Sequence, residues 1–124
     1  MGFKEWLLTE GTQAAIIVRT NDDKYSMSYS QYDGYLEGIG AQLKKYFKTQ
    51  KNVDELVSNS GEIRGIDKGK IEFYAGRKLL KTNLSEDKVI DEANSFAQYK
   101  YYFNGVNWYY STNKISSLDD MKQL

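Results

Sequence analysis

Histidine and cysteine are absent from the chain, so its reactive side chains are those of Asp, Glu, Lys, Tyr and Ser. This composition excludes the common catalytic triads, thiol nucleophiles, zinc sites and disulfides within the chain. Any metal would be a hard cation held by oxygen ligands. The adjacent carboxylates that could supply such ligands are Asp22/Asp23, Glu86/Asp87, Asp91/Glu92 and Asp119/Asp120. Adjacent acids usually serve turns and helix dipoles. We therefore expect no enzyme, no metal and no cofactor, with a carboxylate-based metal nuclease as the alternative.

A carboxylate and three glycines lie close together in the segment Tyr32–Gly40. One interpretation is a partner-binding junction in which Asp33, Tyr35 and Glu37 face a partner and backbone amides can hold an anion. The other is a tightly packed helix start that Asp33 caps. Neither the phosphate-binding loop nor the dinucleotide fingerprint fits, because the required lysine and glycine spacings are missing.

Lysines follow this junction on one face of a predicted helix. Leu36, Ile39, Leu43 and Phe47 form its apolar stripe, and the lysines outside that stripe are Lys44, Lys45 and Lys48, with Lys51 just beyond. These cations can contact phosphates or can simply form a solvated face. Lys+Arg and Asp+Glu are both 17, which disfavours nucleic acid as the default partner. The charge is unevenly distributed, however, since residues 39–81 carry ten basic and five acidic residues.

Aromatic residues are concentrated near the carboxyl end, on both sides of the pair Asn104-Gly105. An Asn-Gly pair between β-forming aromatic residues predicts a β-hairpin over 99–110. One face of this hairpin must pack on the core. We expect the core to take at least half of these aromatic residues and the other face to leave Tyr102 or its neighbours partly exposed. Exposed aromatic side chains can anchor a partner or stack on bases, and Tyr102, Trp108 and Tyr110 are the expected partner-binding residues.

The elements that position these groups can be predicted from the hydrophobic pattern. Residues 14–20 and 25–30 form a hairpin in which Ser26, Ser28 and Ser30 lie on the solvent face. A helix over 35–48 and a second, short helix capped by Thr49 or Asn52 follow. The remaining expected elements are strands at 63–66 and 70–74, a helix from Ser85 to Ala93, a short C-terminal helix at 117–121 and a helix or arm at 3–10.

The length of 124 residues is typical of one domain. We expect a single α+β domain over 1–124, with an antiparallel β-sheet and helices packed on one face. No apolar run approaches the length of a membrane span, and the first residues do not form a secretory signal. The chain is therefore expected to be a soluble cytoplasmic protein, as a monomer or a homodimer.

The segment Ser28–Leu43 resembles a family of small proteins that phages and integrated mobile elements encode. Its most specific part is the aromatic-Asp-Gly-Tyr-x-x-Gly-x-Gly motif, which runs from Tyr32 to Gly40. Family members also have a helix that closes with a tyrosine, as at Tyr46, and a later aromatic hairpin with a Gly turn and a Trp. The resemblance follows the order of these features over most of the chain.

One departure from the family pattern limits what the resemblance implies. Members often carry His-Trp before the Asp-Gly pair, and Gln31 and Tyr32 stand there in this chain. A His-dependent activity, if the family has one, would therefore be absent.

The resemblance implies a phage or mobile-element accessory protein, and proteins of that context often inhibit host defence, as anti-CRISPR proteins do. We expect stoichiometric occlusion of a host protein or ribonucleoprotein defence complex in the bacterial cytoplasm. The expected contact residues are Asp33, Tyr35, Glu37, Lys44, Lys45, Lys48, Tyr102, Trp108 and Tyr110. A nucleic-acid-binding accessory protein that uses Lys44–Lys51 is one alternative. A small-ligand sequestering protein is another, which a deep pocket lined by Tyr and Arg would favour.

Overall fold

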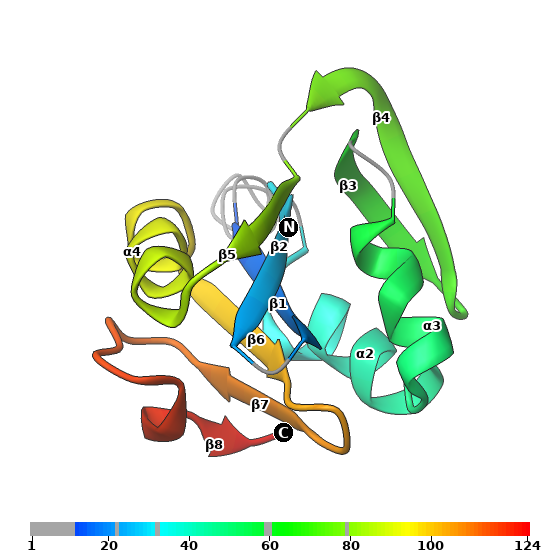
Figure 1. Ribbon diagram of the computed structural model, residues 1–124. Coiled ribbons are helices and arrows are strands. Elements are labelled where there is room, and N and C mark those ends of the chain that lie inside the picture. Colours follow the sequence, from blue (N-terminus) through cyan, green and yellow to red (C-terminus); the bar gives the residue numbers. More distant parts are fainter. Residues whose placement is uncertain (1–11, 22, 32, 59–60, 79) are drawn as a thin grey trace, which may run out of the picture.

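The computed structural model describes residues 12–21, 23–31, 33–58, 61–78 and 80–124 (Figure 1). The helix or arm expected at 3–10 lies outside these residues. In the described part of the chain, all strands join one eight-stranded sheet with the order β4-β3-β2-β1-β6-β7-β8, and β5 pairs separately with β2. The strands are β1 Ala14–Asn21, β2 Lys24–Ser30, β3 Gly61–Asp67, β4 Lys70–Lys78, β5 Lys81–Leu84, β6 Tyr99–Phe103, β7 Trp108–Ser111 and β8 Lys122–Gln123.

The central strand β1 determines the topology. It pairs antiparallel with β2, as the hairpin prediction required, and parallel with β6 on its other edge. A second parallel contact joins β2 to β3 at Ser30 and Ile63. The predicted α+β class is confirmed, but the sheet is mixed rather than antiparallel. A mixed sheet arises because β6 enters beside β1 after a long connection, not as part of a hairpin with it.

Helices cover both faces of the sheet, which corrects the expectation of helices on one face (Figure 1). The first group is η1 Leu36–Gly40, α2 Ala41–Tyr46, α3 Gln50–Asp54 and η2 Glu55–Val57. These elements pack on one face, where Ala14, Ile16 and Val18 of β1 lie. The long helix α4, Glu86–Phe96, packs on the opposite face against Ala15 and Ile17. The apolar run of β1 is therefore buried on both sides, as in strands at the centre of a two-sided sheet.

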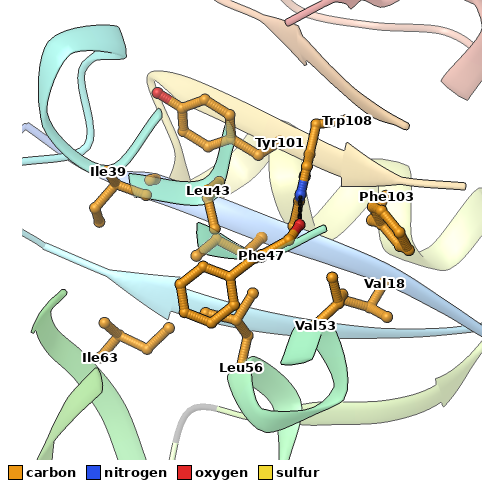
Figure 2. Packing of buried hydrophobic residues seen from close by; sticks show 12 residues of the cluster. Val18, Ile39, Leu43, Phe47, Val53, Leu56, Ile63, Tyr101, Phe103 and Trp108 are labelled. Atoms are coloured by element: carbon orange, nitrogen blue, oxygen red, sulfur yellow. Dashed lines mark hydrogen bonds between the residues drawn. The ribbon is translucent and has the colours of Figure 1, made fainter. Parts of the chain in front are cut away.

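The core under α2 and α3 is aromatic and closely packed (Figure 2). Leu43 and Phe47 from the α2 region and Leu56 from η2 face Tyr101 and Phe103 on β6. The Trp108 ring lies 5.2 Å from Phe103, centroid to centroid. Its indole Nε1 donates a 2.7 Å hydrogen bond to the Phe47 carbonyl, drawn in Figure 2. This bond ties the end of α2 to the hairpin of β6 and β7.

The serine row of β2 is buried, although the alternating Tyr/Ser pattern predicted a solvent face. Ser26, Ser28 and Ser30 are at most 5% exposed, because they pair with Val18, Ile16 and Ala14 under α2 and α3. Tyr25 and Met27 pack on the α4 side. Alternation shows which residues share a face, but not whether a later helix covers that face.

Local cap signals correctly predicted where α3 and α4 begin. The Thr49 hydroxyl accepts from the Asn52 amide at 3.2 Å, and the Ser85 hydroxyl accepts from the Lys88 amide at 3.3 Å. The expected C-terminal helix is the short η3, Leu118–Asp120. A capping box holds it, in which the Asp120 carboxylate accepts from the amides of Ser116 and Ser117.

Candidate binding surface

The motif glycines of Tyr32–Gly40 form a closely packed junction with β1 and β6. A Cβ added at Gly34 would lie 2.9 Å from Ala14 Cβ, and one at Gly38 would lie 2.4 Å from the Asp33 carbonyl oxygen. At Gly40 the added atom would lie 3.0 Å from the Tyr101 hydroxyl. Close contact with neighbouring backbone and side-chain atoms therefore explains the glycines, as the packed-helix-start interpretation required.

Tyr101 is the central residue of this junction, and the sequence pattern did not single it out. Its buried hydroxyl donates a 2.6 Å hydrogen bond to the Gly34 carbonyl. Burial raises the pKa of Tyr101, and the nearby Tyr99 and Glu37 add to the shift. One signal could have indicated this arrangement: three glycines within seven residues indicate that other groups approach the backbone closely there.

Asp33 does not act as the expected helix cap. The cap position of η1 is Tyr35, and no side-chain hydrogen bond caps this turn. Asp33 has a φ of 57° and is exposed, and its backbone carbonyl accepts from the Ile39 amide at 2.8 Å. The helix expected over 35–48 is consequently split, because Gly38 leaves helical geometry between η1 and α2. Glu37 is exposed and Tyr35 is half-buried on the outside of the junction.

The hairpin aromatics are mostly core residues. Trp108 is buried with its indole nitrogen bonded to Phe47, and Tyr102 is buried against Tyr25 under α4. Tyr110 is half-buried beside the α2–α3 core. The expectation that Tyr102 and Trp108 are exposed anchors is therefore wrong, because they pack in the two core clusters on opposite faces of the sheet.

The predicted lysine face is exposed. We use the name lysine surface for Lys44, Lys45, Lys48 and Lys51, together with the neighbouring Lys68 and Lys70, all of which are exposed. Within the described residues none of these side chains forms an ion pair. Lys45 Nζ lies 5.4 Å from the centre of the Tyr46 ring. Six cations without a carboxylate partner among the described residues thus occur on a chain whose formal net charge is zero.

The turn between β3 and β4 extends the lysine surface beyond α2. The Gly69 amide donates to Gln42 Oε1 at 3.1 Å, and a Cβ at Gly69 would lie 3.0 Å from Tyr46 Cβ. Gly69 has a φ of 81°, which favours glycine at this point of contact. Docking of the turn on α2 places Lys68 and Lys70 beside the helix lysines.

An open groove of about 450 Å³ continues from this turn toward η2. Its lining residues are Glu55, Ser58, Lys68, Gly69, Lys70, Ile71 and Phe73. Phe73 and Ile71 are half-buried and form an apolar floor next to the two lysines. The groove offers an extended chain two lysines, the carboxylate of Glu55 and an apolar floor.

The carboxylate pairs do not form a metal site among the described residues. No group of three or more acidic side chains in that part of the chain could hold a metal ion. Asp120 caps η3, and Glu86 Oε2 accepts from the Leu118 amide at 3.4 Å. Asp120 and Glu86 therefore have structural partners within the fold.

Comparison with known proteins identifies no relative: no family model, no curated protein and no solved structure matches the chain. None of the described helices is long and apolar enough to cross a membrane.

Proposed function

We propose that this protein is a stoichiometric binding protein that occupies an anionic surface of a larger complex through its lysine surface. The observation that carries the proposal is the set of exposed cations on α2, α3 and the β3–β4 turn, none of which pairs with a described carboxylate. Natural surfaces usually intersperse both signs of charge. A group of lysines without ion pairs among the described residues, in a segment with ten basic and five acidic residues, is suited to an anionic partner.

Phosphates are the partner groups that this surface fits best. Lysine is depleted in ordinary protein–protein interfaces, whose strongest contacts come from buried Trp, Tyr and Arg. The aromatic residues that could have supplied such contacts, Tyr102 and Trp108, are core residues here. Lysine contacts to a phosphate backbone need no aromatic anchor and release condensed counterions.

The complex that combines these properties is a ribonucleoprotein. Its RNA supplies the phosphates, and its protein supplies the additional surface that a neutral chain needs for tight binding. On the basis of the sequence resemblance, we propose a host defence ribonucleoprotein, which a phage or mobile-element protein would inhibit by occlusion. The lysine surface speeds docking, because complementary charge raises association rates more than it lowers dissociation rates.

A nucleic-acid-binding accessory protein is the second candidate. The groove beside Lys68 and Lys70 favours it, because the half-buried Phe73 offers an apolar contact to an extended strand. Single-strand binding proteins combine a basic groove with aromatic platforms in this way. In this candidate, bare nucleic acid binds without any protein.

A retention experiment with bacterial lysate separates the two candidates. The immobilised chain should retain a protein–RNA complex at physiological salt. The triple variant Lys44→Glu, Lys45→Glu, Lys48→Glu should lose this complex. Ribonuclease treatment of the lysate should also release the complex, because cleavage of the RNA breaks up the phosphate backbone that the lysines contact.

The control is a second triple variant with the same change of net charge, Lys24→Glu, Lys88→Glu, Lys114→Glu. These three lysines are exposed and lie outside the lysine surface. The proposal requires this variant to retain the complex. Equal loss in both variants, or retention that ribonuclease leaves unchanged, would contradict it. Retention of RNA without protein would support the second candidate.

A further inference from the structure

A second concave site lies on the other face of the sheet from α2 and α3, where the parallel strands β1 and β6 end. It encloses about 260 Å³ and is more closed than the groove beside β4. Its lining residues are Arg19, Tyr102, Asn104, Tyr109, Leu118, Asp119 and Met121. Arg19 lies on β1, Tyr102 lies on β6, and Tyr109 lies on β7. Asn104 follows β6 directly, and Leu118, Asp119 and Met121 lie in or directly after η3.

The floor of this pocket is apolar and aromatic. Leu118 and Met121 are buried, and they pack in the same cluster as Tyr102. The rings of Tyr102 and Tyr109 have centroids 6.4 Å apart, at 33° to one another. Such walls accept a flat ring, because aromatic and apolar side chains give contact area at little entropic cost.

Three polar side chains line the same pocket and offer both donors and acceptors. Arg19 can donate through its guanidinium, and the Asp119 carboxylate can only accept. Asn104 Oδ1 already accepts from the amides of Val106 and Asn107, both at 2.9 Å. These two bonds fix the orientation of the Asn104 side chain. Its NH₂ group is therefore the part that can donate to a ligand.

The segment that carries Asp119 is held in place by hydrogen bonds that do not involve the Asp119 side chain. The Asp119 amide donates to Ser117 Oγ at 3.1 Å, and Asp120 completes the capping box. Glu86 of α4 accepts from the neighbouring Leu118 amide. The carboxylate of Asp119 is therefore presented by a preformed segment, which lowers the ordering cost of binding.

From this geometry we infer that the pocket binds a single nucleoside with guanine as its base. Guanine presents two acceptors, O6 and N7, which an arginine can engage together. The neighbouring N1 and N2 hydrogens of the same base are donors, and one carboxylate can accept both. Arg19 and Asp119 supply this complementary pair, Asn104 adds a donor, and the tyrosines and Leu118 enclose the ring faces.

Charge and size restrict the ligand further. One cation, Arg19, and one carboxylate, Asp119, line the pocket, and Glu86 lies close enough to Tyr102 to act on its hydroxyl electrostatically. A neutral nucleoside suits such surroundings, whereas a phosphate would also meet the carboxylates of Asp119 and Glu86. The volume is just below the range typical of drug-sized ligand sites, and it suits one nucleoside rather than a dinucleotide. This inference is independent of the lysine surface, which lies on the opposite face.

Two-dimensional amide NMR titration with guanosine and adenosine tests the assignment. We expect saturable shifts at Arg19, Asn104 and Asp119, with guanosine binding at least about tenfold more tightly than adenosine. Asp119→Asn should abolish the preference for guanosine without altering the fold, because no hydrogen bond or ion pair within the described part of the chain uses that carboxylate. Asp87→Asn, an equal charge change at an exposed position on α4, should leave guanosine binding unchanged.

Three results would overturn the inference. The first is the absence of shifts with either nucleoside at its solubility limit. The second is equal affinity for guanosine and adenosine, which would show that the base edge is not recognised. The third is an Asp119→Asn variant that keeps the guanosine preference while its amide spectrum remains that of the folded protein.

Discussion

Ser28 illustrates how a residue-level pattern can indicate the wrong environment. Its hydroxyl lies under α2 and α3 and has no hydrogen-bond partner in the described structure, although the residue is only 1% exposed. A buried hydroxyl without a partner costs stability, because water would have bonded it in the unfolded chain. The local alternation with tyrosine could not reveal this, since the covering helices come later in the sequence.

We predict that Ser28→Ala stabilises the protein by about 1 kcal/mol, because alanine removes the unsatisfied hydroxyl and leaves almost the same volume. Chemical denaturation monitored by tryptophan fluorescence gives the free energy of unfolding. Ser30→Ala is the matched control on the same strand face, since Ser30 is equally buried and does have an interaction partner. This control should be destabilised. A Ser28→Ala protein less stable than wild type would show that the hydroxyl is satisfied.

Individual site residues could be predicted where exposure follows from local sequence. The lysines fell outside the apolar stripe of their helix, and the structure places them at the surface as expected. Tyr102 and Trp108 could not be placed in the same way, because tyrosine and tryptophan are common both in cores and at interfaces. Tyr102 is buried in the cluster that contains α4 and Leu118, and Trp108 is buried in the cluster that contains Leu43 and Val53.

At the scale of elements, the junction before α2 behaves as one packed unit of loop, strand and aromatic ring. Gly38 leaves helical geometry and lies against the Asp33 carbonyl, while the Tyr101 hydroxyl holds the Gly34 carbonyl. The number of glycines predicted an irregular start, and the structure confirms it. Their partner on β6 could not be predicted, because it lies more than 60 residues away in the sequence.

We predict that Gly38→Ala destabilises the protein by about 1–3 kcal/mol, because the added methyl group must displace backbone atoms of Asp33. Thermal and denaturant unfolding measure the effect. Gly65→Ala provides the control on β3, since an added Cβ there meets no atom within 4 Å. That variant should be neutral or slightly stabilised, because alanine lowers the entropy of the unfolded chain. A similar loss of unfolding free energy in Gly38→Ala and Gly65→Ala would argue against the packed junction.

Strand identity was easier to predict than strand pairing. The hairpins β1–β2 and β6–β7 follow from turn residues and short separation, and both form. The parallel pairing of β1 with β6 has no local signal, because the two strands are separated by most of the fold. The unbroken apolar run at 14–18 did carry information, since such a run is typical of a strand covered on both faces.

At the scale of the whole molecule, the buried tyrosines determine how the fold responds to alkali. Burial raises the pKa of Tyr102 from 10.0 to about 12, and the nearby Tyr25 adds to the shift. The folded state therefore keeps a proton that the unfolded state releases. Its stability is fully present below pH 10 and is lost as the pH rises toward 12.

We predict that the free energy of unfolding falls between about pH 10 and pH 12, and that Tyr102→Phe shows a shallower fall because phenylalanine does not titrate. Denaturation curves at stepped pH values measure both. Tyrosinate absorbance of the folded wild type should show a tyrosine that titrates well above pH 10. This titration should be absent in the Tyr102→Phe variant. Parallel losses of stability in the two proteins would contradict the assignment to Tyr102.

Charge is segregated over the whole molecule. Residues 39–81, which form α2, α3, β3 and β4, carry ten basic and five acidic residues, whereas the flanking segments are net acidic. A chain with a formal net charge of zero therefore presents a basic side to solvent. This asymmetry was visible in the sequence, but its concentration around Gln42, Tyr46 and Gly69 depends on the docking of the β3–β4 turn.

The most direct measurement of the central claim is the salt dependence of binding to a labelled single-stranded RNA, followed by fluorescence anisotropy. We predict weak binding near physiological salt and tighter binding at low salt, with a log–log slope of about 0.7 per phosphate contact. Lys44→Glu, Lys45→Glu, Lys48→Glu should lose this binding, and Lys24→Glu, Lys88→Glu, Lys114→Glu should keep most of it. Binding that is insensitive to salt, or that both triple variants weaken equally, would contradict the assignment of the lysine surface.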